Sequence, residues 1–144
     1  MLRGIPPVIS PELLKILCEM GHGDEICIGD GNFPGASCAK NSILLRADGH
    51  GVPELMEAIL ELFPLDTYAP PIALMAKAEI DCDLEIPIWD EFRAIADKYT
   101  TMKFEYVERN AFYERAKNSY AIIMTGERAI YANVILKKGV VIIK

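Results

Sequence analysis

Several kinds of segment are missing from this chain of 144 residues. It has no cluster of lysine and arginine, and its formal net charge is −6, which argues against nucleic acid and anionic membrane surfaces as partners. No run approaches the roughly 18 apolar residues that a membrane-spanning helix needs. Residues 1–7 lack the apolar core of a secretion signal. We therefore expect a cytoplasmic protein with neither a membrane nor a nucleic-acid partner.

Motifs for metal, nucleotide and nucleophilic chemistry are missing as well. No two of the four cysteines are spaced as a CxxC pair, which argues against a zinc ribbon or a thioredoxin-like site, so we expect reduced, structural cysteines. With only two histidines, His22 and His50, a metal site of two or three histidines within one subunit is not expected. The chain has no glycine-rich phosphate loop, no GxSxG and no HExxH. These absences argue against nucleotide use and nucleophilic hydrolysis.

What is present is an apolar chain with alternating patterns. Apolar residues make up 51% of it, enough for one domain, residues 1–144, with its own core. Helices are expected at 11–20, 52–63, 89–99 and 110–117. Ser10 and Asn110 are the expected caps of the first and last helix. Strands are expected at 25–29, 42–46, 72–78, 103–107, 120–124 and 130–136. This alternation predicts a layered α/β domain with a central, mostly parallel sheet and helices packed on its faces.

A seventh strand, 140–143, is expected to form a hairpin with 130–136 around residues 137–139. Its sequence, Val140-Val141-Ile142-Ile143, is entirely apolar, and an exposed edge of that kind aggregates. The strand must therefore be central in the sheet or covered by another subunit. For so apolar a chain we expect an obligate oligomer.

The candidate catalytic residue is His22, which lies between Gly21 and Gly23. The two glycines leave its side chain free to reach a cavity, and histidine titrates in the range that suits proton transfer near neutral pH. Asp30 follows the strand expected at 25–29, where open α/β sheets place ligand-binding groups. Together they predict acid–base chemistry on a small polyhydroxy compound. The alternatives are a loop histidine satisfied by nearby backbone and an aspartate that caps the following turn.

Three further residues are candidates for binding such a compound. Tyr131 and Asn133, two apart on an expected strand, would point to the same side of the sheet. Sugar sites use an aromatic ring against the apolar side of the sugar and an amide for paired hydroxyls. The alternative is a partly buried tyrosine beside an asparagine at the sheet edge. Arg109, between a strand and a short helix, either lines the site or pairs with Glu108 or Glu114 on the surface.

Eight segments, in order over nearly the whole chain, resemble the sugar mutarotase family that contains L-fucose mutarotase and D-ribose pyranase. Each is weak alone, but the ordered set is specific. They are 9–14 (ISPELL), 21–25 (GHGDE), Asp30 with Phe33-Pro34, 46–49 (RADG), 68–71 (YAPP), 112–116 (FYERA), 125–128 (TGER), and 131–133 (YAN) followed by 136–140 (LKKGV). Segments 112–116 and 125–128 belong to the fucose branch, whereas the ribose branch carries much the same 131–133 triplet.

The resemblance implies an isomerase that interconverts the α and β anomers of L-fucose, or the pyranose and furanose forms of a related sugar. It implies an enzyme without cofactor or metal, assembled as a ring-shaped homodecamer with sites between neighbouring subunits. His22 matches the family's proton-donating histidine. Asp30, Arg109 and the triplet Tyr131-Ala132-Asn133 match its sugar-binding positions.

Two small differences bear on the choice of sugar. The fucose branch often has glycine at position 132 and alanine at position 31, where this chain has Ala132 and Gly31. A ribose-type pyranase therefore remains the nearest alternative, and it differs in sugar rather than in mechanism. Two alternatives of another class are a sugar-binding protein without catalysis and a purely structural oligomer.

Overall fold

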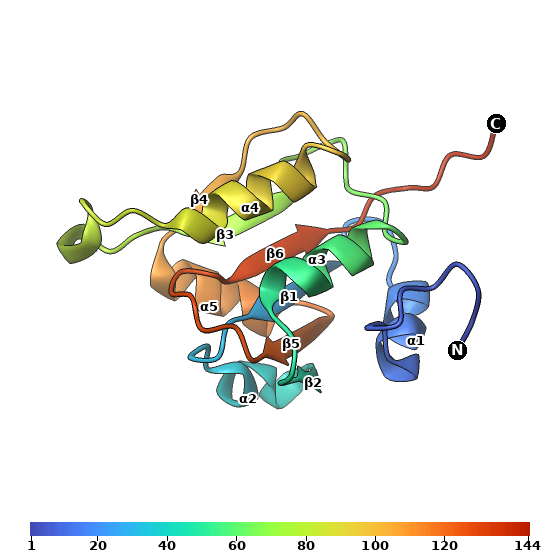
Figure 1. Cartoon of the computed structure of the whole chain (residues 1–144), viewed down its shortest axis with the longest axis horizontal. Coiled ribbons are helices and arrows are strands. Elements are labelled where there is room, and N and C mark those ends of the chain that lie inside the picture. Colours follow the sequence, from blue (N-terminus) through green and yellow to red (C-terminus); the bar gives the residue numbers. More distant parts are fainter.

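A six-stranded sheet forms the centre of the structure, a computed structural model that describes residues 1–144 (Figure 1). The strands are β1 (Glu25–Gly29), β2 (Ile43–Ala47), β3 (Ile72–Met75), β4 (Glu105–Val107), β5 (Ala121–Thr125) and β6 (Val134–Lys137). The helices are α1 (Pro11–Glu19), α2 (Gly35–Cys38), α3 (Val52–Leu60), α4 (Pro87–Ala96) and α5 (Arg109–Lys117), with 3-10 turns η1 (Ala39–Asn41) and η2 (Glu79–Asp81). All four expected helices and six of the seven expected strands are present.

The strand order is β2-β5-β1-β6-β3-β4, and β6 alone runs against the other five strands. This confirms the predicted mostly parallel sheet. The carboxyl ends of five strands therefore meet at one end of the sheet, together with the amino end of β6. We call this the carboxyl end of the sheet and the opposite one its amino end.

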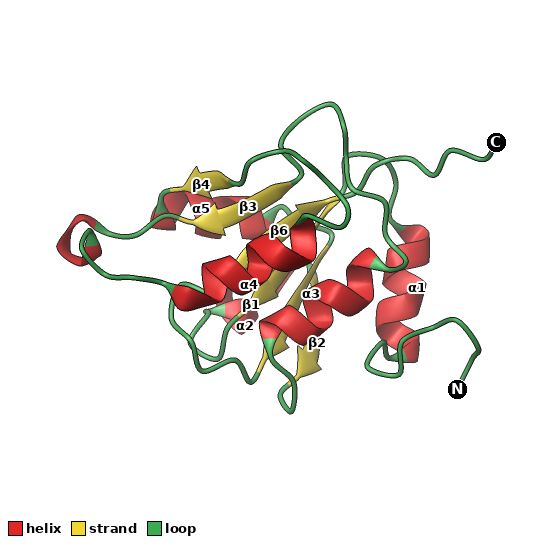
Figure 2. Cartoon of the chain, turned by 45° about the horizontal axis from the view of Figure 1, so that its top comes forward, coloured by secondary structure: helices red, strands yellow, loops and turns green.

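Helices cover both faces of the sheet, because its strands alternate apolar side chains between the two faces. Ile26 and Ile28 of β1 belong to the larger core, under α1, α3 and α4. Cys27, between them, belongs to the smaller core, under α2 and α5. Figure 2 shows α3 and α4 crossing one face of the sheet, with α2 and α5 behind it. No helix of the structure is long and apolar enough to span a membrane.

The two expected helix caps have different outcomes. The hydroxyl of Ser10 accepts the backbone N–H of Leu13 at 3.1 Å, which confirms the first cap. The prediction for Asn110 is wrong, because α5 begins one residue earlier and its cap is Glu108. The Glu108 carboxylate is long enough to accept the N–H groups of both Asn110 and Ala111, at 2.9 and 3.1 Å. Asn110 is thus a residue of the first helical turn.

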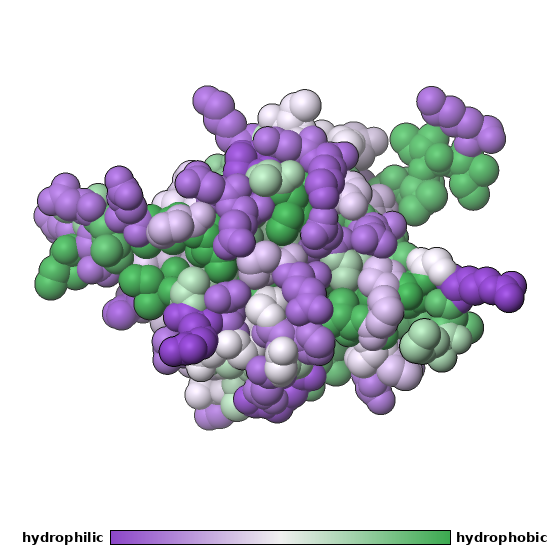
Figure 3. Space-filling view, viewed as in Figure 1, coloured by the Kyte–Doolittle hydropathy of each residue, from purple (hydrophilic) through white to green (hydrophobic).

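The expected hairpin at the end of the chain does not form. After β5, the chain has one strand, β6 (Val134–Lys137), and it is paired on both sides, with β1 and with β3. A hairpin partner would need a free side of β6, and none is left. Residues 140–143 are instead 55–91% exposed, and Figure 3 shows this apolar segment standing away from the body of the molecule. The prediction of a strand at 140–143 is therefore wrong, and of the two alternatives given for it, a central place in the sheet is excluded.

All four cysteines are free, which agrees with the expectation of reduced thiols. Cys27 is fully buried in the sheet, and this burial raises the pKa of its thiol well above the usual value. Cys38 is also buried, whereas Cys18 and Cys82 are exposed. A buried thiol with a raised pKa is protonated and inert at neutral pH, so Cys27 acts as a small apolar residue.

Candidate active site

The carboxyl end of the sheet brings five of the six predicted site residues to one side of the molecule. Asp30 directly follows β1, and Arg109 follows β4 at the start of α5. Tyr131, Ala132 and Asn133 directly precede β6. They reach the same end because β6 is antiparallel to its neighbours. This is the position at which open α/β sheets bind their ligands.

Asp30 and Asn133 are joined by hydrogen bonds that build a buried polar cluster. The backbone N–H of Asp30 donates to the side-chain oxygen of Asn133 at 2.8 Å. The Asp30 carboxylate accepts the N–H of Asn32 at 3.0 Å and that of Ala132 at 3.4 Å. Asp30 and Asn133 are 3% and 5% exposed. The loop after β1 and the segment before β6 therefore hold each other in place within a single chain.

Burial raises the pKa of Asp30 above its usual value. The N–H groups of Asn32 and Ala132 favour the ionised carboxylate and partly oppose this rise, whereas the negative charge of Glu127 adds to it. Because a buried carboxylate has lost contact with water, hydrogen bonds from hydroxyl donors stabilise it strongly. The cluster is thus suited to orienting the hydroxyl groups of a small polar ligand.

Tyr131 is not on a strand, so the prediction that Tyr131 and Asn133 share one side of a strand is wrong. Its backbone has φ 54°, a left-handed conformation that non-glycine residues rarely adopt. The indole N–H of Trp89 donates to its carbonyl at 2.8 Å. Its hydroxyl accepts the N–H of Ala78 at 3.0 Å and donates to the Asp81 carboxylate at 2.6 Å. These contacts fasten the arm of residues 76–86 to the segment before β6.

Arg109 is exposed, and of its two alternatives the surface pair with Glu108 or Glu114 does not form. Glu108 uses its carboxylate to cap α5, and Glu114 pairs with Lys117 at 2.7 Å. The hydrogen bond to Asp81 raises the pKa of Tyr131, and the positive charge of Arg109 opposes that rise. Arg109 is therefore an available cation near Tyr131, at the carboxyl end of the sheet.

His22 lies at the other end of the sheet, on the turn between α1 and β1. Its Nε2 lies 3.1 Å from Oδ1 of Asp66, and its ring centroid lies 5.3 Å from that of Tyr68. Asp66 is buried, but the side chain of His22 is 45% exposed. Because an ionised carboxylate only accepts, Nε2 carries the hydrogen, and Nδ1 is left free to take a proton.

Asp66 is a candidate site residue that the sequence did not identify. Burial alone would raise its pKa, but hydrogen bonds from His22 and from the N–H of Tyr68 outweigh burial and lower it. Asp66 is therefore ionised at neutral pH and fixes the orientation of the imidazole. The available signal was a lone carboxylate in the apolar loop Pro64-Leu65-Asp66, which by itself does not name its partner.

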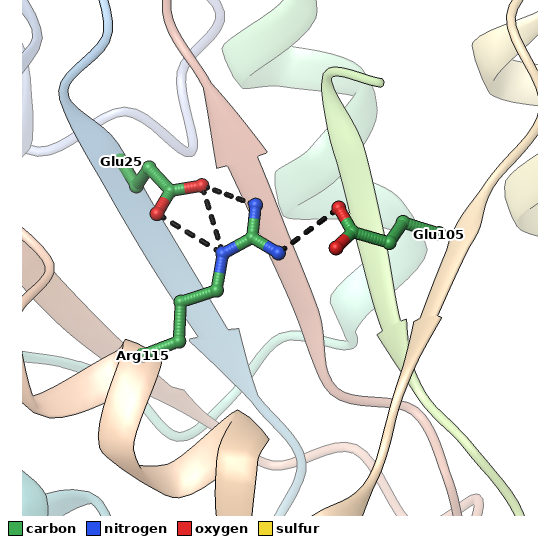
Figure 4. A network of polar contacts seen from close by, with 3 residues as sticks. All are labelled: Glu25, Glu105 and Arg115. Atoms are coloured by element: carbon green, nitrogen blue, oxygen red, sulfur yellow. Dashed lines mark hydrogen bonds and ion pairs between the residues drawn. The ribbon is translucent and has the colours of Figure 1, made fainter. Parts of the chain in front are cut away.

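An ion-pair network anchors the start of β1 beside the turn that carries His22 (Figure 4). The guanidinium of Arg115, on α5, donates to both carboxylate oxygens of Glu25, with the shortest distance 2.6 Å. It also donates to Glu105, at the start of β4, at 3.1 Å. The side chains of Arg115 and Glu25 are about one-fifth exposed, at 21% and 17%. The network thus ties α5 to two strands at the amino end of the sheet.

His22 and Asp30 do not meet within one chain, because the whole of β1 lies between them. At about 3.3 Å per residue, the five residues of this strand separate the two groups by roughly 15 Å. Asp30 therefore cannot orient His22 in the same subunit. One end of the sheet can bind a polyhydroxy compound and the other can move a proton, and neither holds both functions. The structure has no group of three or more His, Cys, Asp and Glu side chains that could hold a metal ion.

Known proteins resemble this chain over nearly its full length. Residues 3–141 match the RbsD / FucU transport protein family. A fucose mutarotase of Danio rerio is 48% identical over 145 residues, which cover 98% of this chain and 95% of that protein. A crystal structure of the fucose mutarotase of Streptococcus pneumoniae in complex with L-fucose is 48% identical, with a TM-score of 0.91 over 98% of this chain and 100% of that one.

A more distant structure shares the fold alone. Bacillus subtilis RbsD, complexed with D-ribose, is 23% identical and has a TM-score of 0.74 over 93% of this chain and 95% of that one. The family match spans every helix and strand, and the relatives at 48% identity are matched over 98% of this chain. On these grounds the chain belongs to the RbsD / FucU family.

Proposed function

We propose that the chain is an L-fucose mutarotase, an isomerase that interconverts the α and β anomers of L-fucopyranose. The observation that carries the proposal is the match, at 48% identity and a TM-score of 0.91, to a fucose mutarotase that holds L-fucose. The polar cluster of Asp30 and Asn133 and the exposed, oriented imidazole of His22 supply the binding and proton-transfer groups that this reaction needs.

Anomer exchange requires only the movement of protons. The anomeric hydroxyl loses a proton and the ring oxygen gains one, while the bond between the anomeric carbon and the ring oxygen breaks to give the open-chain aldehyde. The carbonyl turns, and the reverse steps close the ring on its other face. The reaction already proceeds in water, so general acid–base catalysis, which typically contributes about 10² to 10⁴-fold, is sufficient. The proposal requires no metal or cofactor.

Each site residue has a defined part in this mechanism. Asp30 accepts hydrogen bonds from sugar hydroxyls, and Arg109 and Tyr131 lie beside the sugar. Asn133 and the backbone of Ala132 hold the Asp30 cluster in shape. His22 shuttles the proton between the anomeric hydroxyl and the ring oxygen, with Asp66 fixing its orientation.

The proton-transfer group and the binding cluster come from different subunits in this proposal. What supports it is their separation by the length of β1 within one chain. An interface that joins the amino end of one copy to the carboxyl end of the next is head-to-tail, and such interfaces give a ring when the rotation between successive copies closes. The proposal includes the homodecamer that the family resemblance implies. It also places the protein in the cytoplasm, where free thiols such as its four cysteines persist.

The first experiment is NMR saturation transfer between the α and β anomeric signals of L-fucose, with and without the protein, near neutral pH. We expect faster exchange with the protein, and D-ribose is measured in parallel. Exchange of L-fucose no faster than in buffer would overturn the proposal. Acceleration of D-ribose alone would replace it with a ribose-type pyranase.

A subunit-mixing experiment tests the shared site. The variants His22→Gln and Asp30→Asn each lack one half, so each alone is expected to be inactive. When the two are unfolded together and reassembled at equal ratio, about a quarter of head-to-tail interfaces regain both intact halves. We expect partial recovery of exchange. Absence of recovery in properly assembled mixtures would contradict a site shared between subunits.

A further inference from the structure

The apolar segment of residues 140–143, which we call the tail, leaves the molecule beside His22. The N–H of Gly23 donates to the carbonyl of Lys138 at 2.8 Å, and the N–H of Lys138 donates back to Asp24 at 2.8 Å. Gly139 donates to the carbonyl of Pro64 at 2.7 Å, two residues before Asp66. The start of the tail is therefore fixed on the same surface as the His22–Asp66 pair.

The tail itself has no cover within its own chain. Val140, Val141, Ile142 and Ile143 are 55%, 66%, 79% and 91% exposed. Four consecutive apolar side chains in water are unfavourable, and a contiguous apolar surface of this kind marks a contact with another molecule.

A small apolar groove flanks the binding cluster at the carboxyl end of the sheet. Its volume is about 330 Å³. It is lined by the start of α4 and by the turn before Tyr131, with Ile86, Pro87, Ile88, Ala129 and Ile130 as its apolar residues. Ile130 is 51% exposed and directly precedes Tyr131. The groove is thus next to the sugar-binding half of the site, as the tail is next to the proton-transfer half.

We propose that the tail of one subunit docks in the groove of the next subunit of the ring. This inference rests on the proposed site shared between subunits. If His22 of one copy and Tyr131 of its neighbour approach the same monosaccharide, the start of the tail and Ile130 also lie close together across the interface. Four extended residues reach about 13 Å, so the tail can extend from the surface of His22 onto a subunit that faces it. In a single chain the tail and the arm of residues 76–86 lie at opposite ends of the molecule (Figure 1).

The charges at the groove favour this occupant. Three carboxylates, Glu85, Glu91 and Glu127, are among the residues that line it, and the tail is followed by the ammonium group of Lys144. An apolar segment with one positive side chain matches an apolar groove that also carries acidic side chains. The contact fastens His22 against the neighbouring sugar cluster, so the tail stabilises the ring and the active site together.

The test disrupts the tail by charge while leaving the catalytic groups in place. The double variant Val141→Asp/Ile143→Asp is compared with Val141→Ile/Ile143→Val, which keeps both side chains apolar and branched at Cβ. Oligomer size is measured by sedimentation over a range of protein concentrations, and L-fucose exchange is measured in the same samples. We expect the Asp variant to dissociate at a concentration at least about tenfold higher than the wild type. Its exchange per subunit is expected to fall on dilution and recover on concentration, while the control behaves as the wild type.

A reciprocal change tests the groove. Ile130→Lys alone is expected to weaken assembly, and combining it with the Asp tail is expected to restore part of the loss by opposite charge. The proposal is overturned if the Asp tail assembles as the wild type does, or if Ile130→Lys has no effect. If subunit mixing of His22→Gln and Asp30→Asn succeeds while the tail variants are silent, only the docking proposal fails. If the wild type is monomeric at every concentration, both the docking proposal and the proposal of a site shared between subunits are overturned.

Discussion

The two ends of β1 carry opposite kinds of polar site. At the carboxyl end, Asp30 and Asn133 are buried, and their geometry is set by backbone hydrogen bonds within one chain. At the amino end, His22 is half exposed and makes one side-chain hydrogen bond, to Asp66, beside the ring of Tyr68. The first is a preformed binding cluster, and the second is a proton-transfer group that faces outward.

This difference separates the energetic roles of the two ends. Groups that are buried and hydrogen-bonded contribute to folding as well as to binding, whereas an exposed imidazole contributes little to folding. Changes at the carboxyl end should therefore alter stability and activity together. Changes to His22 should alter activity far more than stability.

The largest expected effect is that of His22→Gln. It removes the proton shuttle, so L-fucose exchange should fall by about 10²-fold or more. The glutamine amide can still donate a hydrogen bond to Asp66, so the unfolding free energy should change little. His50→Gln is the matched control, because His50 is exposed and its side chain makes a hydrogen bond only with Glu54. Saturation transfer and urea unfolding measure both quantities. Unchanged exchange in the His22 variant would remove it from the mechanism.

Asn133→Ala should show the opposite behaviour at the carboxyl end. It leaves the buried N–H of Asp30 without an acceptor, which costs about 1–3 kcal/mol of unfolding free energy, and it loosens the sugar cluster. Asn32→Ala is the control, because Asn32 is exposed and only its backbone contacts Asp30. Urea unfolding and titration with L-fucose measure the effects. Equal stability of the two variants would contradict a preformed cluster.

Arg115→Leu tests how the amino end is anchored. It leaves Glu25 without its partner, so we expect a loss of about 1–3 kcal/mol in unfolding free energy, less than for a fully buried pair. Arg115→Lys keeps the charge but not the paired geometry, and should lose less. Arg46→Leu breaks the exposed pair with Asp48 and is the control. Arg115→Leu as stable as the wild type would show that the network does not anchor β1.

The smallest and sharpest comparison is the pH dependence of the two aspartates. The pKa of Asp30 is raised by burial, so its contribution to stability is greatest at low pH and is lost as pH rises through that raised pKa. The pKa of Asp66 is lowered despite burial, because His22 and the Tyr68 N–H bond its carboxylate. The contribution of Asp66 to stability is fully present above the usual pKa of an aspartate, at about pH 4. It is lost as the pH falls through the lowered pKa.

On acidification from neutral pH, Asp30 should therefore be protonated before Asp66. Sugar binding should weaken while the His22–Asp66 pair is still intact. NMR titration of the aspartate carboxyl carbons measures the order directly, with Asp30→Asn and Asp66→Asn to assign the signals. The reverse order would contradict the environments described for the two ends.

The sequence predicted most of the fold because its signals are local. Ser10-Pro11 and the periodic leucines define α1, and the apolar run of residues 25–29 defines β1 with the same bounds as in the structure. The sequence-based prediction failed where the conformation of a segment depends on contacts with residues distant in the sequence. The apolar run at 140–143 has strand propensity, but β6 is already paired on both sides. Tyr131 lies in an alternating pattern, yet contacts with Trp89, Ala78 and Asp81 hold it in a turn.

The candidate site shows the same difference between local signals and contacts distant in the sequence. The residues Asp30, Arg109, Tyr131, Ala132 and Asn133 were identifiable as candidates from the motifs around them, and so was His22. Asp66 was not, because a buried carboxylate is recognised by the group that it bonds, and His22 is 44 positions away in the sequence.

The sequence by itself determined the elements, their α/β class and the chemical kinds of group available, since periodicity, caps and motifs are properties of neighbouring residues. Only the tertiary structure decided which groups meet. The antiparallel β6 brings Asn133 to Asp30, and the length of β1 keeps His22 from both, because a strand holds its two ends apart by a fixed rise per residue.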